Sequence, residues 1–306
     1  MDAVSAPHAP SQPLIQVFYR YTATANNKAR PAYFSKSLAL QSFVNAVRAA
    51  GEQIAVNFLV DGELADDTRA LMDSVGTVTL GSWNSNRSSY LAQIERARAT
   101  GAQLSWFAED DYLYAPDALA RLAEAVRRWP EVDWFALTGP TRLERLELRR
   151  AQGPVALPPS PRWPAKQGAG RGWRRIDSTT STFGGRPRAI RQTSWLLRLC
   201  PWSGAAWDRT TCLAVQGATP YPWRHVLHDL LPASTPKRLL GVRLLWRVAT
   251  RLAVNLAALT QRRRPAVLVA PEVPLVGHME LPYEERPEVW DSLAAELLQE
   301  DCQQSA

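Results

Sequence analysis

The chain has 306 residues, of which 46% are hydrophobic and 21% charged, so it can build a full globular core in one large domain or two smaller ones. Its 36 Lys and Arg against 29 Asp and Glu give a net charge of +7, which attracts phosphate groups in general. Three cysteines without CxxC spacing argue against a disulfide framework or a zinc site. Residues 1–13 lack the apolar segment of a signal peptide, so we expect a disordered tail and a cytoplasmic protein.

The first half of the chain alternates strand patterns with helix patterns. The predicted strands are 14–22, 53–62, 77–80 and 104–111, and the predicted helices are 31–50, 66–74 and 88–99. Strands separated by such helices imply an α/β fold with a mostly parallel, doubly wound sheet. In such a sheet, ligands bind beyond the carboxyl ends of the strands.

The second half is less regular and rich in helix patterns. The expected segments are a helix at 116–129, a strand at 132–139, a charged helix at 141–151, a lid-like loop at 152–175, an extended segment at 178–190, a short helix at 203–214, an amphipathic helix at 237–259, an apolar run at 267–280 and a C-terminal helix and tail at 292–306. No internal repeat is apparent.

The fourth strand ends in three consecutive carboxylates, Glu109, Asp110 and Asp111. Ionised at close range they repel one another, so either solvent or a hard divalent cation must offset their charge. If the strand continues through them, Glu109 and Asp111 share one face and Asp110 takes the other, which gives an acidic-x-acidic pair able to hold a metal. The alternative is a solvated acidic turn before the next helix.

Other polar residues follow neighbouring strand ends. Asp61, before a glycine, could accept a hydrogen bond from a nucleotide base, or it could simply end the strand in an Asp-Gly turn. Arg20 and Arg30, near the first strand, could face phosphate or remain solvated. Asn86, with the neighbouring serines, could approach a phosphate or serve a helix cap.

His278 follows the late apolar run and precedes Glu280. Imidazole and carboxylate together suit Mn²⁺, so His278 is a candidate metal ligand if the fold returns it to the acidic cluster, although a lone histidine is more often structural.

The predicted helix at 237–259 and the arginines up to 264 combine apolar residues with a stripe of Arg243, Arg247 and Arg251. The pattern fits an interfacial helix that contacts a membrane peripherally, at the inner face for a cytoplasmic protein. It also fits a helix packed on the sheet with a basic exposed face, the commoner case.

Together, the strand and helix order, Asp61, the acidic-x-acidic element and the late His278 with Glu280 resemble a GT-A fold nucleotide-sugar glycosyltransferase, broadly similar to the family 2 enzymes. The resemblance implies a nucleotide-sugar-binding half at 14–139 and an acceptor-side half at 140–291. It implies Mn²⁺ or Mg²⁺ on Asp111 and His278, the base near Asp61, and ribose or a metal-bound water near Glu109. It also implies phosphate contacts from the basic groups, with Asp110 in the same donor site.

The sequence departs from that family in two ways. Family 2 enzymes usually carry Asp at the position of Glu109, although an EDD form occurs in other GT-A enzymes. The usual acidic pair of the acceptor side is not evident, so Asp208 becomes the candidate catalytic base, with His228 and Asp229 in reserve. Asp208 could equally stabilise a helix dipole.

The sequence therefore predicts a metal-dependent transferase that moves a sugar from a nucleoside diphosphate sugar to an acceptor hydroxyl of a glycan, lipid or small molecule, with inversion favoured by the resemblance. The alternative is a non-catalytic module that docks on anionic lipid or polymer. Nucleic acid is not an expected partner, because no aromatic-basic motif of a known module is present. A nucleotidyltransferase would need a glycine-rich phosphate loop near the first strand, and the sequence lacks one.

Overall fold

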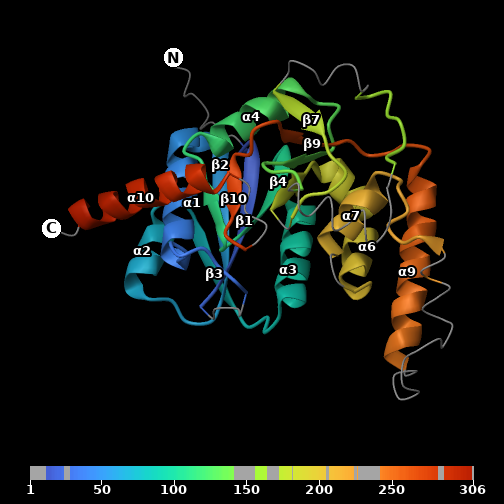
Figure 1. Cartoon of the computed structure of the whole chain (residues 1–306), viewed down its shortest axis with the longest axis horizontal. Helices are drawn as coiled ribbons and strands as arrows, with labels where there is room; N and C mark the ends of the chain where they lie inside the picture. Colours follow the sequence, from blue (N-terminus) through green and yellow to red (C-terminus); the bar gives the residue numbers. More distant parts are fainter. Residues whose placement is uncertain are drawn as a thin grey trace, which may run out of the picture.

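A large mixed sheet flanked by helices on both faces forms the centre of the molecule (Figure 1). The computed structural model describes residues 12–23, 28–140, 156–163, 172–180, 182–204, 207–223, 226, 242–281 and 286–304. The strands of the eight-stranded sheet, in spatial order, are β3 (Thr77–Gly81), β2 (Ile54–Asp61), β1 (Ile15–Thr22), β4 (Leu104–Glu109), β8 (Phe183–Gly185), β6 (Trp134–Ala136), β9 (Leu268–Pro271) and β7 (Trp173–Arg175).

The first four strands are parallel and confirm the predicted α/β class. β1 pairs with β2 on one side and β4 on the other, and β2 pairs with β3. This arrangement requires the chain to cross over β1 between β3 and β4. The point where the strand order reverses therefore lies between β1 and β4, and ligand crevices of open α/β sheets lie beyond the carboxyl ends of the strands at such a point.

Helices cover both faces of this sheet, as expected for a doubly wound fold. The helices are α1 (Lys36–Ala50), α2 (Asp66–Asp73), α3 (Asn86–Ala99), α4 (Ala118–Arg128), α6 (Pro187–Leu199), α7 (Trp207–Val215), α9 (Val242–Gln261) and α10 (Pro287–Gln304). Alternation along β1 sends Val17 and Tyr19 into the core beneath α1 and α4, whereas Phe18 enters the core beneath α3, α6 and α7. Alternate residues of β1 thus belong to two separate apolar cores, one on each face of the sheet.

The remaining strands extend the same sheet with mixed direction. β8 runs antiparallel between β4 and β6, β9 is parallel to β6, and β7 closes the edge antiparallel to β9. A Cβ on Gly184 or Gly185 would lie 2.7 Å from Trp106 or 2.3 Å from Trp134, so the tryptophans require glycine there. Most of the strands still point the same way, and both halves of the chain contribute to one sheet.

The extended segment predicted at 178–190 is partly wrong, because α6 begins at Pro187. Pro at the first helical position is preorganised for a helix, and the preceding Arg186 is extended. The buried Arg186 side chain donates to the carbonyl of Val126 in α4 and to those of Trp129 and Val132 just beyond α4. These hydrogen bonds connect the start of α6 to the end of α4.

Other predicted boundaries shift by a few residues. α10 starts at Pro287, before the predicted 292, and α9 covers most of the predicted 237–259 helix. In the range predicted as a lid-like loop, Trp163 and Trp173 are buried against Trp129, and none of its described residues lines the pocket described below. The predicted helix at 141–151 lies outside the described residues, as do residues 1–11 of the predicted tail. Within the described part of the chain, no helix is long and apolar enough to cross a membrane.

Candidate functional site

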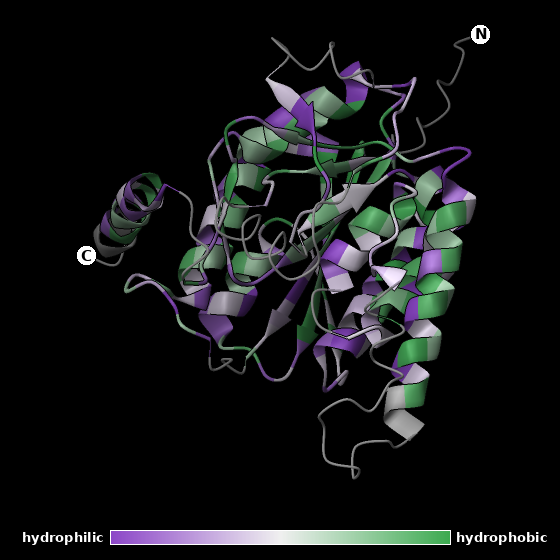
Figure 2. Cartoon of the chain, turned by 45° about the vertical axis from the view of Figure 1, so that its right-hand side comes forward, coloured by the Kyte–Doolittle hydropathy of each residue, from purple (hydrophilic) through white to green (hydrophobic). Residues whose placement is uncertain are grey.

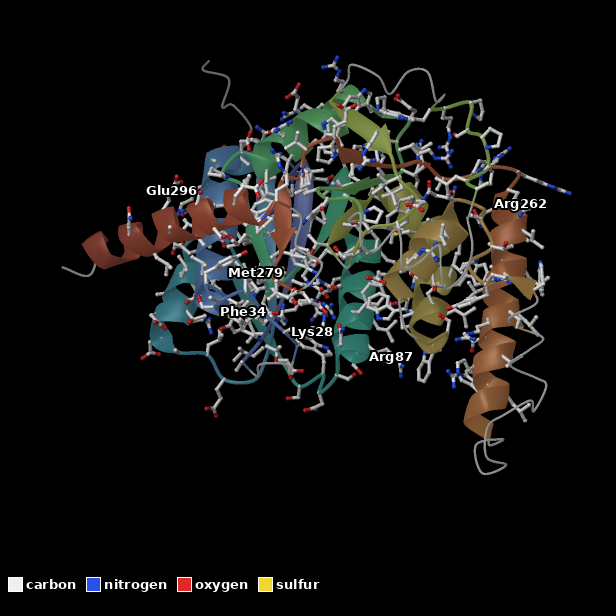
Figure 3. All side chains as sticks on the ribbon, viewed as in Figure 1. Lys28, Phe34, Arg87, Arg262, Met279 and Glu296 are labelled. Carbon is white, nitrogen blue, oxygen red and sulfur yellow. The ribbon has the colours of Figure 1, made fainter. Side chains whose placement is uncertain are left out.

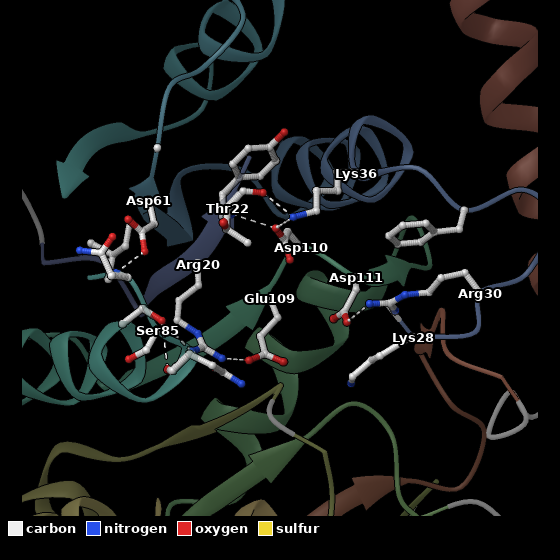
Figure 4. A pocket seen from close by; sticks show the side chains of 17 residues that line it. Arg20, Thr22, Lys28, Arg30, Lys36, Asp61, Ser85, Glu109, Asp110 and Asp111 are labelled. Atoms are coloured by element: carbon white, nitrogen blue, oxygen red, sulfur yellow. Dashed lines mark hydrogen bonds and ion pairs between the residues drawn. The ribbon is translucent and has the colours of Figure 1, made fainter. Parts of the chain in front are cut away.

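A pocket of about 550 Å³ opens at the carboxyl ends of β1, β2 and β4, the position that the strand order indicates (Figure 4). Polar side chains dominate its wall. The lining residues are Arg20, Tyr21, Thr22, Lys28, Arg30, Phe34, Lys36, Leu59, Asp61, Gly62, Asn84, Ser85, Asn86, Ser89, Glu109, Asp110 and Asp111. Seven of the predicted donor-site and metal residues therefore meet in one cavity: Arg20, Arg30, Asp61, Asn86, Glu109, Asp110 and Asp111.

The three carboxylates all face this pocket, so the predicted separation of Asp110 onto the opposite face is wrong. β4 ends at Glu109 and the next two residues form a turn, which stops the alternation of a strand. Because of the turn, the carboxylates point to different parts of the pocket, with Asp110 toward Lys36 and Asp111 toward Arg30 (Figure 4).

Each carboxylate has a cationic partner from the first part of the chain. Glu109 pairs with Arg20, Asp110 pairs with Lys36 at 2.8 Å, and Asp111 pairs with Arg30 at 3.0 Å. The backbone N–H of Thr22 also donates to Asp110 Oδ2 at 2.9 Å. The charge that the sequence assigns to solvent or a metal is thus balanced largely by side chains within the protein.

Burial lowers the pKa of a basic side chain in this pocket and raises the pKa of an acidic one. Desolvation lowers the pKa of Arg20 to about 10, which leaves it charged at neutral pH. Desolvation also raises the pKa of Asp110 against the opposing pull of Lys36. Although burial alone would raise the pKa of Asp111, hydrogen bonding from His278 and the charge of Arg30 hold it well below its usual range. Asp111 is therefore an anion under all physiological conditions.

His278 returns to the acidic cluster, as the sequence hypothesis required. A short strand, β5 (Tyr112–Tyr114), follows the acidic turn directly, and β10 (Val276–His278) pairs with it antiparallel so that His278 lies opposite Tyr112. The two rings stack at 4.5 Å and 9°. His278 Nε2 consequently lies 3.4 Å from Asp111 Oδ2 and 3.3 Å from Glu280 Oε2.

The opposite end of the pocket holds Asp61 (Figure 4). Its Oδ2 accepts a hydrogen bond from the backbone N–H of Asn84 at 2.8 Å, and Asn84 has a positive φ of 55°. Between the two ends, Arg20 donates to the carbonyl oxygen of Asn86 at 2.7 Å and to Ser89 Oγ at 2.9 Å. Asn86 therefore orients Arg20 from the start of α3, while Ser85 caps that helix.

Asp208, the predicted catalytic base, is not among the residues that line the pocket. It occupies the first turn of α7, where its Oδ1 accepts from the N–H of Arg209 at 2.8 Å. Burial raises the pKa of Asp208, and the charges of His278 and Lys28 act against that shift, which places Asp208 within electrostatic reach of the metal-ligand candidates. The reserve candidates His228 and Asp229 lie outside the described residues.

Sequence reasoning missed Lys36, which bonds both Asp110 and the carbonyl of Thr22. The sequence contains an indication of Lys36, because it follows Ser35, the N-cap of α1. The first residues of a helix that follows β1 lie near the carboxyl ends of the strands. Also missed was the pairing of Lys28 with Glu280, which links the first loop to the end of β10. Figure 3 shows Lys28, Phe34 and Met279 gathered at this side of the molecule.

The donor set is compatible with a divalent cation, although no group of three or more His, Cys, Asp or Glu among the described residues is arranged to hold one by itself. Asp111 Oδ1 is buried without a hydrogen-bond partner. Such an atom is costly unless something occupies it. With the nitrogen of His278 alongside, it offers an oxygen and an imidazole of the kind that Mn²⁺ accepts, and the remaining ligands would come from phosphate oxygens.

No protein-family model and no curated protein sequence matches the chain. Among solved structures, a CMP-2-keto-3-deoxy-manno-octonic acid synthetase complexed with CTP aligns over 95% of this chain and 100% of its own at 13% identity, with a TM-score of 0.42. A UDP-glucose pyrophosphorylase complexed with UDP-glucose aligns over 94% and 99% at 7% identity, with a TM-score of 0.43. Mouse xyloside xylosyltransferase 1 aligns over 60% and 72% at 12% identity, with a TM-score of 0.38.

All three similarities are distant. The strand order and the pocket at the carboxyl ends define a Rossmann-like α/β fold, the fold class that the sequence predicts.

Proposed function

We propose that the protein is a metal-dependent glycosyltransferase that moves a sugar from a nucleoside diphosphate sugar to an acceptor hydroxyl. The observation that carries this proposal is that His278, from a distant part of the chain, lies 3.4 Å from Asp111, which lines one end of a pocket whose other end holds Asp61. The unpartnered Oδ1 of Asp111 supplies the independent sign that a ligand belongs there.

The pocket divides naturally into a base end and a phosphate end. Asp61 would accept a hydrogen bond from the nucleotide base, in place of or beside the N–H of Asn84. Glu109, held centrally by Arg20, would face the ribose. A pocket of about 550 Å³ falls within the roughly 300–1,000 Å³ typical of small-molecule sites, which is ample for a nucleotide.

The phosphate end is rich in cations that can change partner. Lys28, Arg30 and Lys36 each bond a carboxylate in the structure, and each also lines the pocket. A diphosphate entering there would compete with those carboxylates for the same N–H donors. Lys28 has a side chain 46% exposed, so it can turn to a ligand at the lowest desolvation penalty.

Asp111 and His278 would hold the metal ion, Mn²⁺ or Mg²⁺, which when bound would act as a Lewis acid that stabilises the leaving diphosphate. Asp208 would accept the proton of the acceptor hydroxyl, since its raised pKa makes it a better base than an ordinary aspartate. A single base that deprotonates the acceptor hydroxyl for an in-line displacement is the arrangement of an inverting transfer, which is the stereochemistry that we propose. The acceptor class, whether glycan, lipid or small molecule, is set by surfaces beyond this pocket.

The test is the Asp111→Ala variant compared with Asp117→Ala, which removes an exposed carboxylate at the start of α4. We expect Asp111→Ala to lose Mn²⁺-dependent hydrolysis and transfer of a nucleotide-sugar donor by at least a hundredfold, because it loses the metal ligand and the partner of Arg30 together. Asp117→Ala should turn over at the wild-type rate. Circular dichroism would establish that both variants fold.

Wild-type turnover in Asp111→Ala would overturn the assignment. Nucleotide-sugar binding by the wild-type protein without any metal-dependent turnover would instead favour a non-catalytic binding module.

A further inference from the structure

The outer face of α9 is apolar and exposed to solvent. Leu245, Trp246 and Leu256 are 61%, 57% and 58% exposed, and Ala249 and Ala253 lie exposed between them at helical spacing. Figure 2 shows the hydrophobic colouring along this helix at the edge of the molecule. A surface helix normally presents polar residues to solvent, so the apolar outer face of α9 departs from the usual pattern.

The inner face of α9 is satisfied by the protein itself. Val248, Val254 and Ala258 are buried in the core that α9 shares with α6 and α7. Arg251 also turns toward the body, where it lies 4.8 Å from the ring of Tyr221 and donates to the carbonyl of Ser203 at 3.1 Å. The predicted exposed basic face is therefore wrong at Arg251, although Arg247 is exposed.

Positive charge flanks the apolar stripe. The range 242–264 contains six arginines and no acidic residue. Arg247 is exposed near the start of α9, while Arg263 and Arg264 are exposed just beyond its end. Figure 3 places Arg262 at the same end of the helix. The surface thus joins an apolar strip with cationic ends.

Two further tryptophans lie exposed on neighbouring elements. Trp202 belongs to η3 (Cys200–Trp202), which contacts α9, and Trp195 lies on the adjoining α6. They are 44% and 48% exposed, and Arg87 stacks over Trp202 at 4.1 Å. Tryptophan and arginine are the side chains that bridge an apolar layer and a layer of phosphate headgroups.

We propose that this surface, the outer face of α9 with the flanking arginines, docks in the plane of an anionic phospholipid bilayer. The apolar stripe would enter the acyl boundary, and the arginines would meet the headgroup phosphates. A second copy of this chain is a poor occupant, because it would bring two sets of arginines together without a single acid in 242–264 to offset them. The inference is independent of the proposed catalytic activity.

Cosedimentation of the full chain with vesicles tests the proposal. We expect binding to vesicles of phosphatidylcholine with about a third phosphatidylglycerol, and about tenfold weaker binding to pure phosphatidylcholine, since headgroup charge contributes to the attraction. Leu256→Asp and Leu245→Asp should each weaken binding to the anionic vesicles about tenfold. Leu80→Asp is the matched control, because Leu80 is also 61% exposed but lies on β3, and it should bind as the wild type does.

Absence of vesicle binding, or equal binding by Leu256→Asp and Leu80→Asp, would overturn the proposal. So would sedimentation of a concentration-dependent dimer that Leu256→Asp abolishes, since a second copy would then be the occupant. Thermal unfolding of each variant separates lost docking from lost folding, and two aspartate positions keep the test valid if one variant fails to fold.

Discussion

At the scale of single residues, the acidic side chains of the pocket form ion pairs with its basic side chains. Glu109, Asp110 and Asp111 each face a different cation, and two of those cations, Arg30 and Lys36, come from a stretch of the chain that sequence patterns treat as a loop and a helix start. Partly buried pairs of this kind gain Coulomb energy against a desolvation penalty of similar size. They add little net stability, but they hold donors and acceptors aimed at the cavity, and a charged ligand can exchange with them.

Asp208 carries a prediction about pH at this scale. Because burial raises its pKa, its ionised form appears only at a higher pH than for an ordinary aspartate, so kcat/KM should rise with pH along an acidic limb displaced upward. Asp208→Asn should lose transfer by about a hundredfold or more and lose that limb as well. A pH profile of the wild type and of the variant checks this.

The same shift has an opposite effect on folding. A carboxyl whose pKa is higher in the folded state binds more protons there, so its contribution to stability falls as pH rises from the unfolded pKa through the folded one. At neutral pH, Asp208→Asn should therefore unfold at a higher temperature than the wild type while being inactive. An Asn variant that is both active and no more stable would show that Asp208 is only a helix-start residue.

At the scale of elements, the two-stranded pair of β5 and β10 builds the metal-ligand end of the pocket. The sequence predicts neither strand boundary, because β5 and β10 are each three residues long, too short for a strand period to be recognised. Pairing across so long a stretch of sequence cannot be read from local periodicity. What could be predicted was that an apolar run ends at His278, and the chemistry of His278 made it a candidate before its neighbours were known.

Gly277 allows this pair to form. A Cβ there would lie 2.5 Å from the ring of Trp290 on α10, which packs over β10. We expect Gly277→Ala to destabilise the fold by about 1–3 kcal/mol through overpacking, and to weaken Mn²⁺ binding because the displaced strand carries His278.

Gly139→Ala is the control for that change, since its added Cβ would meet its neighbours at 3.5 Å, an ordinary contact. Urea unfolding measures the stability difference, and calorimetric titration with Mn²⁺ and a nucleoside diphosphate measures the affinity. Equal values for the two alanine variants would contradict the role assigned to Gly277.

At the scale of the whole molecule, the sequence predicts the parallel half of the sheet well and the rest poorly. Repeated alternation of apolar strands and amphipathic helices predicts that β1 to β4 are parallel, and hence that a ligand site lies at their carboxyl ends, whereas their spatial order comes from the structure. The second half depends on contacts between distant tryptophans and glycines, such as Trp134 over Gly185, which no short pattern encodes. The surroundings of α9 could not be predicted for a related reason, because its sequence fits both an interfacial helix and a helix packed on the sheet until its neighbours are placed.

The pocket as a whole should respond to its donor by stabilising the folded chain. Base and phosphate ends belong to different elements, Asp61 on β2 and His278 on β10, so a nucleoside diphosphate sugar that spans them would hold the two halves of the chain together. A ligand at a hundred times its Kd adds about 2.7 kcal/mol to the free energy of unfolding, which corresponds to a rise of roughly 4 °C in Tm for a chain of this length. We expect this rise only with Mn²⁺ or Mg²⁺ present, and only for donors whose base can donate a hydrogen bond to Asp61.

A panel of nucleotide sugars in a thermal unfolding assay identifies these donors, with Asp111→Ala as the variant that should show no metal-dependent rise in Tm. A rise that is the same in that variant and in the wild type would mean that the donor binds through the basic side chains alone, and the acidic turn would then serve to place those cations and not a metal.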